Sequence, residues 1–185
     1  MLVLMGRTCS GKNAIAEELK KMGYSQLVTY TSRPIRHGEI EDVTYHYLAL
    51  NEFIEKKYAG FFAECKEYYT ANGLWMYGTG KDDIDKADDN TFCILTPDGY
   101  ESIRDKKNLF AVHITVSDKT VIDRQKTRND DVIEAKRRFV ADKKDFENVS
   151  CDWEVRNEGV SAEEVAQEIS TVYRFNVENR KLWCV

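Results

Sequence analysis

Apolar and polar residues alternate along this chain with the periods of strands and helices. The run 2–5 is entirely apolar and ends at a glycine, which is typical of a strand that a sheet buries on both faces. Apolar residues then recur at spacings of four and three, at Ile15, Leu19 and Met22, and Gly23 ends the pattern. This opening predicts a strand, a glycine-containing loop and a helix.

A second set of buried strands is predicted in the other half of the chain. Residues 91–95 and 109–116 are rich in apolar side chains, and residues 99–106 between them have the pattern of a helix. Helical spacing continues through 118–128 and 131–148. This alternation predicts an α/β fold with a parallel central sheet.

The last predicted helix has both a start signal and an apolar stripe. Ser161 and Glu164 have the spacing of a capping box, in which each side chain bonds to the backbone of the other residue. Val165, Ile169 and Val172 follow on one helical face.

The middle of the chain has a different pattern. Residues 61–79 are rich in aromatic side chains, and the Asn-Gly pair at 72–73 is a strong signal for a tight hairpin turn. An antiparallel segment is thus predicted between two parallel ones. We expect a core formed by 1–30 and 88–185, interrupted by a smaller lobe from about 31–87.

Length, charge and cysteine content narrow the class of protein. The 185 residues suit one domain. The net charge is -5, and basic and acidic residues are both distributed along the chain, so neither a nucleic-acid-binding tail nor a membrane-binding patch is expected. The five cysteines are scattered and lack zinc-site spacing, which favours a reducing, cytoplasmic setting. The apolar N-terminal run is too short to span a bilayer and lacks a cleavage site, so no targeting signal is expected.

The loop after the first strand matches the phosphate-binding pattern GxxxxGK. Its residues are Gly6, Arg7, Thr8, Cys9, Ser10, Gly11 and Lys12. Backbone N–H groups of such a loop and of the following helix hold phosphate oxygens, and Lys12 adds a charge between the β- and γ-phosphates of ATP. A glycine turn with an incidental lysine is the less favoured alternative. Asn13 departs from the pattern, which has a Ser or Thr hydroxyl on Mg²⁺ there; its amide oxygen could bind the metal, or water could take that role.

A second anion site is indicated after residue 30. Arg33 and Arg36 lie three residues apart in a loop that proline and glycine stiffen, and two such arginines can hold one phosphate between them. The phenol of Tyr45 can add a neutral hydrogen bond. In isolation, a solvated basic turn would explain these residues equally well.

This segment resembles the acceptor loop of the guanylate kinase family. That loop has an arginine, a second arginine three residues later, a Gly-Glu pair and a tyrosine six residues after the glutamate. Five residues fall on these positions, namely Arg33, Arg36, Gly38, Glu39 and Tyr45. The resemblance implies that the loop binds GMP. Pro34 directly follows the first arginine, where the family usually has a residue in between.

The resemblance continues through the predicted hairpin and implies contacts to the base. Glu64 falls on the family's glutamate that contacts guanine, and Tyr77 falls on a tyrosine that binds the GMP phosphate. Thr79 and Thr29 match hydroxyl residues at the base. The chemistry agrees, because guanine presents N1–H and the N2 amino group side by side and one carboxylate can accept from both. The alternative for Glu64 is a residue on the surface of a strand.

A helical lid of about 124–140 is implied next. The family's lid arginines correspond to Arg124, Arg128 and Arg138, with Arg137 as an alternative register for the last. Lone arginines on helices are usually solvated, so these assignments rest on the resemblance.

Further residues complete the implied site. Asn157 fits a family asparagine near the adenine of ATP. Asp98 retains the second of two family aspartates at a strand end, where Thr96 replaces the first. Asp98 is therefore a candidate for GMP binding and, with Asn13, a candidate Mg²⁺ ligand.

The resemblance extends over nearly the whole chain. It implies a single guanylate-kinase-like domain of 1–185 with the three-layer P-loop NTPase fold, a parallel central sheet, a small mixed or antiparallel acceptor-binding lobe and a helical lid. It also implies an enzyme, a nucleoside monophosphate kinase that transfers the γ-phosphate of ATP to GMP or dGMP. Mg²⁺ is the implied cofactor, and the implied partners are small-molecule substrates.

Two other functions compete with this interpretation. A related P-loop kinase that acts on a ribose bisphosphate also has Arg and Pro together, as in Arg33-Pro34, but such an acceptor offers no guanine to Glu64 and Thr79. A guanylate-kinase-like binding module of the scaffold-protein type would do no chemistry, and it would have little need of Lys12 and the loop glycines.

Overall fold

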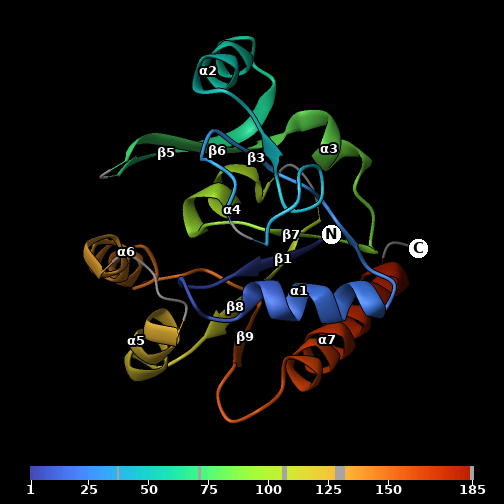
Figure 1. The fold of residues 1–185 in the computed structure, drawn as a ribbon. Coiled ribbons are helices and arrows are strands. Elements are labelled where there is room, and N and C mark those ends of the chain that lie inside the picture. Colours follow the sequence, from blue (N-terminus) through green and yellow to red (C-terminus); the bar gives the residue numbers. More distant parts are fainter. Residues whose placement is uncertain (37, 71, 106–107, 128–131, 184–185) are drawn as a thin grey trace.

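The computed structural model describes residues 1–36, 38–70, 72–105, 108–127 and 132–183, and it contains two sheets (Figure 1). The larger sheet has five strands, all parallel, in the order β2-β7-β1-β8-β9. These strands are β1 (Leu2–Met5), β2 (Ser25–Gln26), β7 (Thr91–Ile94), β8 (Phe110–Thr115) and β9 (Trp153–Arg156). The predicted parallel sheet is confirmed.

Helices cover both faces of this sheet (Figure 1). The central strand β1 is apolar on both sides, and the helices bury those apolar side chains. Leu2 and Leu4 point to one face and pack with α1 (Lys12–Lys21) and α7 (Ala162–Trp183). Val3 and Met5 point to the other face, where α3 (Lys81–Lys86) and α4 (Pro97–Ile103) cover them. The result is a three-layer α/β arrangement.

The smaller sheet is mixed and has the order β4-β3-β6-β5. Its strands are β3 (Tyr30–Thr31), β4 (His46–Tyr47), β5 (Phe62–Thr70) and β6 (Gly73–Gly80). The predicted hairpin is confirmed, with Thr70 opposite Gly73, whose φ of 106° suits glycine. Phe53 of α2 (Leu50–Tyr58) packs on this sheet against Phe62 and Met76. The division of the chain into a core and a lobe with limits at 31 and 87 stays a prediction.

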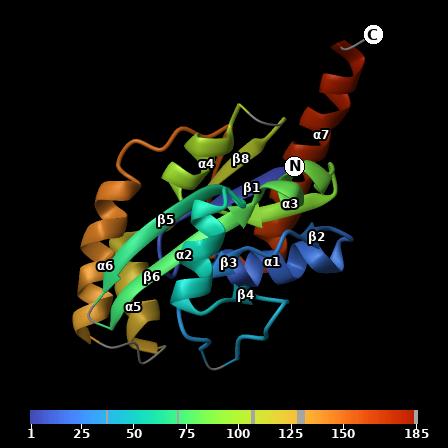
Figure 2. The ribbon, with the colours of Figure 1, turned by 90° about the horizontal axis from the view of Figure 1, so that it is seen from above.

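Two more helices, α5 (Asp118–Thr127) and α6 (Val132–Asp145), lie near each other on one side of the molecule (Figure 1). Figure 2 shows the hairpin of β5 and β6 extending toward α6. The predicted lid of 124–140 spans the end of α5 and the start of α6, and Arg128 lies outside the described residues. Within the described parts of the chain, every helix is either too short or too polar to cross a bilayer.

The helix between the two predicted strands of the second half begins earlier than its pattern indicated. It starts at Pro97 instead of Gly99, because the Thr96 Oγ1 atom accepts a hydrogen bond of 3.2 Å from the backbone N–H of Gly99 and caps the helix. At the other end of the chain, the capping box is confirmed, since the Glu164 N–H donates to Ser161 Oγ and the Ser161 N–H donates to a Glu164 oxygen.

The parallel order of the larger sheet brings several loops to one edge. The glycine loop follows β1, Thr96 follows β7, and Asn157 follows β9. Ligands of open α/β sheets bind outside the carboxyl ends of the strands. Asn157 and Ser10 of the glycine loop are 147 positions apart in sequence, and this edge brings them into contact.

Candidate active site

The loop between β1 and α1 has the backbone geometry of a phosphate-binding turn. Cys9 and Gly11 have positive φ angles of 63° and 97°. A Cβ atom on Gly11 would lie 2.1 Å from Asn157 Nδ2, and one on Gly6 would lie 2.7 Å from the backbone oxygen of Ile114. Both positions therefore require glycine.

The side chain of Lys12 bonds to the backbone of its own loop. Lys12 Nζ donates to the backbone oxygens of Gly6, at 2.6 Å, and Arg7, at 2.8 Å. The N-cap residue of α1 is Gly11, which has no side chain to cap the helix, and the first turn contains no acidic residue. The positive end of the helix and the ammonium of Lys12 together suit a phosphate group.

Asn157 and Arg124 form hydrogen bonds with the backbone of the same loop. Asn157 is buried, and its Nδ2 atom donates to the backbone oxygen of Ser10 at 2.8 Å. Arg124 donates to the backbone oxygens of Cys9, at 2.9 Å, and Asn157, at 3.1 Å. Both residues line a cavity of about 890 Å³, which we call the donor cavity, together with Gly11 and Lys12.

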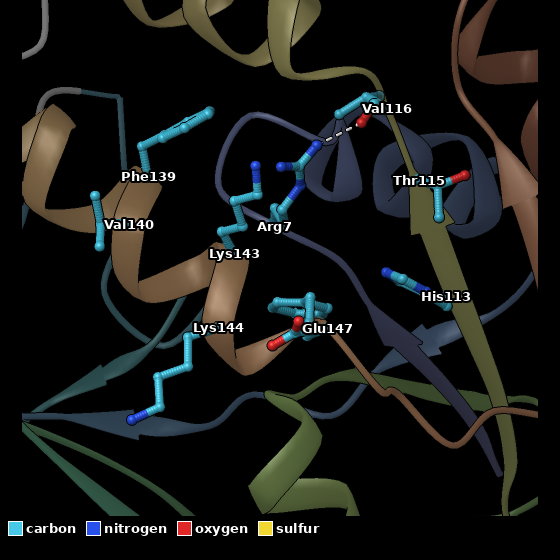
Figure 3. Close-up of a pocket in the computed structure, with 10 residues that line it drawn as sticks. Arg7, His113, Thr115, Val116, Phe139, Val140, Lys143, Lys144 and Glu147 are labelled. Carbon is cyan, nitrogen blue, oxygen red and sulfur yellow. Dashed lines mark hydrogen bonds between the residues drawn. The ribbon is translucent and has the colours of Figure 1, made fainter.

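The side chain of Arg7 points away from this cavity. Its guanidinium donates to the backbone oxygen of Val116 at 2.6 Å and to Asp118 at 2.5 Å. Figure 3 shows Arg7 in a separate hollow beside α6, near Lys143 and Phe139. Any contribution of Arg7 to ATP binding would thus come from its backbone.

A smaller cavity of about 240 Å³, the acceptor cavity, lies between α6 and the sheet that contains the hairpin. Glu64, Lys66 and Tyr68 of β5 line it, because alternate residues of a strand point to the same side. Trp75 and Tyr77 of β6 also line it. Lys66 and Tyr68 are not among the predicted site residues. The sequence could have indicated them, because they lie two and four residues after Glu64 on the same predicted strand.

The predicted base-contacting residues lie together in this region. Thr79 is fully buried, and its Oγ1 atom donates to Glu64 Oε1 at 2.6 Å. Thr29 lines both the donor and the acceptor cavity. On the far side of Glu64, a Cβ on Gly99 would lie only 3.2 Å from Oε2, so α4 closes off that side.

The two arginines of the acceptor loop have different surroundings. Arg33 is only 3% exposed, and both terminal nitrogens of its guanidinium bond to the Glu39 carboxylate at 2.8 Å. Its Nε atom donates to Tyr77 Oη at 3.1 Å. Burial alone would raise the pKa of Glu39, but hydrogen bonds from Arg33 and Tyr47 lower it to about 2. Glu39 thus orders the loop through Arg33, and a joint clamp of both arginines on one phosphate stays a prediction.

The donor and acceptor cavities meet at a positively charged junction. The residues that line both are Thr8, Lys12, Thr29, Arg36, Tyr45, Tyr77, Ile94 and Arg138. They include three cations and, among the described residues, no carboxylate. Burial lowers the pKa of Arg36, and the charges of Arg33 and Arg138 lower it further, so an anion bound here would be stabilised.

Of the predicted lid arginines, Arg138 reaches this junction from α6. Arg138 lines both cavities, whereas Arg137, the alternative register, lines only the acceptor cavity. Glu134 is buried and accepts hydrogen bonds from both arginines. The bond from Arg138 Nε is 2.8 Å long. Asp142, a residue that sequence reasoning missed, accepts a hydrogen bond from the backbone N–H of Thr8. Asp142 of α6 therefore contacts the phosphate loop directly.

The two candidate metal ligands lie in different places. Asn13 is exposed and lines the donor cavity beside Lys12. Asp98 is exposed on α4, and its carboxylate lies 2.6 Å from Lys66 Nζ, outside the residues that line either cavity. Within the described part of the chain, no three His, Cys, Asp or Glu residues cluster in a way that could hold a metal ion. The roles of Asp98 in GMP and metal binding stay predictions without a supporting contact.

Comparison with known proteins agrees with this geometry. The sequence profile of the family described as guanylate kinase matches residues 1–173. The chain belongs to the guanylate kinase family. Members of this family are nucleoside monophosphate kinases, which are transferases.

Individual relatives match over shorter segments. A guanylate kinase of Wolinella succinogenes is 34% identical over 91 residues, which cover 47% of this chain and 40% of that protein. A guanylate kinase of Rhodopirellula baltica is 32% identical over 87 residues, covering 45% and 41%, respectively. The matches thus span less than half the length of these relatives.

The fold is also similar to that of a solved structure. The crystal structure of guanylate kinase from Anaplasma phagocytophilum superposes with a TM-score of 0.72, at 19% identity, over 95% of this chain and 85% of that chain. At this identity the likeness supports the fold.

Proposed function

We propose that this protein transfers the γ-phosphate of ATP to GMP or dGMP, which gives ADP and GDP or dGDP. The observation that carries the proposal is the junction of Lys12, Arg36 and Arg138, where a donor cavity and an acceptor cavity meet. Two phosphates that react with each other must be brought together against their mutual repulsion, and three cations at the meeting point serve that need.

The donor cavity suits ATP. The glycine loop and the amino end of α1 would hold the β- and γ-phosphates, and Lys12 would neutralise charge between them. Asn157 and Arg124 lie behind the loop and would face the nucleoside.

The acceptor cavity suits a guanine nucleotide. Glu64 lies in it with one oxygen oriented by Thr79, and a carboxylate there can accept from both N1–H and the N2 amino group of guanine. Arg36, Tyr45 and Tyr77 line the junction end of the cavity, where they would bind the phosphate of the acceptor. Burial raises the pKa of Tyr45, so its phenol stays a neutral hydrogen-bond donor.

In the reaction, a phosphate oxygen of GMP attacks the γ-phosphorus of ATP, and the bond from that phosphorus to the bridging oxygen of ADP breaks. The protein aligns the two groups and stabilises the charge on the transferred phosphoryl group. Lys12 and Arg138 face the junction from opposite elements, α1 and α6, and would do this in the transition state. Closure of α6 over the site would exclude water.

Magnesium fits this site through the donor nucleotide. Mg²⁺ is usually held by substrate phosphates, water and one or two protein oxygens, so the lack of a described acidic cluster is compatible with it. Asn13 directly follows the lysine and lines the donor cavity, so its side-chain oxygen is the candidate protein ligand. When bound, the ion would neutralise charge on the β- and γ-phosphates.

A panel of acceptors tests the proposal. Purified protein is incubated with ATP, Mg²⁺ and one acceptor at a time, and the products are separated by ion-exchange chromatography. We expect turnover with GMP and dGMP, weaker turnover with IMP and little with AMP, CMP or UMP. Turnover with a ribose bisphosphate but not with GMP would overturn the acceptor assignment. No ATP binding in a titration would favour a non-catalytic module.

A further inference from the structure

We propose that Trp75 is a positioning residue that holds Arg36 and Arg138 at the junction of the two cavities and thereby orders the site for phosphoryl transfer. The inference rests on the proposed function. It concerns a residue near the tip of the hairpin, outside the phosphate loop, the acceptor loop and the lid.

Trp75 lies where these elements converge. It is half-buried on β6, opposite Tyr68 of β5, and it lines the acceptor cavity. The hairpin extends toward α6, the helix that carries Arg138 (Figure 2). Lys66 of the same hairpin forms an ion pair of 3.3 Å with Asp145 near the end of α6. Trp75 and this ion pair are thus two links between the hairpin and α6.

The indole ring contacts one arginine from each partner element. The Cζ atom of Arg36, in the acceptor loop, lies 6.0 Å from the ring centroid, and that of Arg138, on α6, lies 5.8 Å from it. Both distances are within the range of cation–π attraction. One side chain therefore binds two guanidinium groups that are separated by about a hundred residues of sequence.

The two guanidinium groups need such a partner. They repel each other, and this repulsion contributes to the lowered pKa of Arg36. Glu134 forms an ion pair of 2.8 Å with the Nε atom of Arg138, whereas within the described residues no carboxylate forms an ion pair with the guanidinium of Arg36. The negative face of an indole attracts both cations without competing with a phosphate for their N–H groups. Trp75 would thus hold the arginines close enough to receive one anion, while their hydrogen-bond donors stay available to it.

This arrangement makes a kinetic prediction. An arginine that is already in place binds the transition state without a further loss of side-chain entropy. Loss of the indole ring should therefore lower kcat and raise the KM for the acceptor. ATP binding should change less than GMP binding, because the glycine loop, Lys12 and the amino end of α1 would hold most of the triphosphate, and Trp75 does not line the donor cavity. The effect should require an aromatic face and not merely an apolar side chain.

The test compares Trp75→Leu and Trp75→Met with Trp75→Phe in steady-state assays with GMP and ATP. We expect the aliphatic variants to lose roughly five- to thirty-fold in kcat/KM for GMP, which corresponds to about 1 to 2 kcal/mol for two cation–π contacts at the long end of their distance range. Trp75→Phe should recover most of this loss. The KM for ATP should stay within about twofold of wild type.

Trp153→Phe is the matched control. Trp153 lies on β9, and its Nε1 atom contacts Glu168 of α7, remote from both cavities. This variant should retain wild-type kinetics. Thermal melts followed by circular dichroism identify variants that fail to fold, and the use of two aliphatic variants keeps the comparison possible if one is unstable.

A double-mutant cycle separates positioning from general stability. If Trp75 acts through Arg138, then Trp75→Leu should cost much less in an Arg138→Ala background than in wild type. Additive losses would overturn the proposal, as would wild-type kinetics in folded Trp75→Leu or a Phe variant no better than Leu. Failure of the proposed function looks different, because the wild-type protein would then not phosphorylate GMP at all.

Discussion

Replacement of Asp142 by Asn should strengthen ATP binding. In the structure, the Asp142 carboxylate accepts a hydrogen bond from the backbone N–H of Thr8, which belongs to the phosphate loop. The incoming triphosphate carries the same sign of charge and needs the same donors, so it must displace or repel this carboxylate. Asn has nearly the same shape but no charge.

The magnitude follows from two contributions. A hydrogen bond to a charged acceptor contributes about 1.5 to 3 kcal/mol and one to a neutral acceptor about 0.5 to 1.5 kcal/mol, so the amide competes less well for the N–H of Thr8. Removal of the charge also removes repulsion of about 3 kcal/mol for charges roughly 5 Å apart at an effective dielectric constant of about 20, much of which solvent and salt screen at this half-buried position. A net gain of about 1 to 2 kcal/mol makes the Kd for ATP roughly five- to thirty-fold smaller.

Isothermal titration calorimetry with ATP measures this effect. Adenosine is the ligand control, since it has no phosphates and its affinity should not change. Asp145→Asn is the protein control, because Asp145 lies on the same helix but pairs with Lys66 instead of the phosphate loop. An unchanged or weaker affinity of Asp142→Asn for ATP would refute the reasoning, and so would an equal gain for adenosine or for Asp145→Asn.

Three further substitutions test the proposed site. Lys12→Ala should nearly abolish turnover while the protein stays folded, since Lys12 lines both cavities and bonds to the loop backbone at Gly6 and Arg7 instead of packing in the core; near-normal turnover in circular-dichroism-verified protein would exclude the site. Glu64→Gln should reduce the preference for GMP over IMP and AMP in kcat/KM by roughly ten- to several-hundred-fold, because the amide adds a donor and removes the charge; an unchanged preference would place the base elsewhere. Asn13→Ser should raise activity at low Mg²⁺, since a hydroxyl is the usual ligand at this position; an unchanged Mg²⁺ titration would show that the side chain does not bind the metal.

The elements with a strong local signal were predicted well. β1 and the helix after the glycine loop follow from an all-apolar run and a clear stripe, and the hairpin follows from its Asn-Gly pair. Strands β2, β3 and β4 have two residues each, which is too short for any period to be visible. Helices α2 and α3, with nine and six residues, and strand β9 were also missed, since each buries few side chains.

The sequence alone determined the residues of the phosphate loop, because strand, glycine pattern and lysine are contiguous and their local geometry needs nothing else. It also placed Glu64 and Thr79 on one hairpin, where pairing of the strands brings them into contact. These features depend on chemistry within a short stretch of chain.

Tertiary structure decided which side chains share the site. Arg33 and Arg36 look equivalent in sequence, but Glu39 holds the first, and the second lines the junction. Asp142 meets Thr8 across 134 positions. No local pattern encodes such contacts, because they arise from how α6 and the hairpin pack over the edge of the sheet, and packing depends on the whole core.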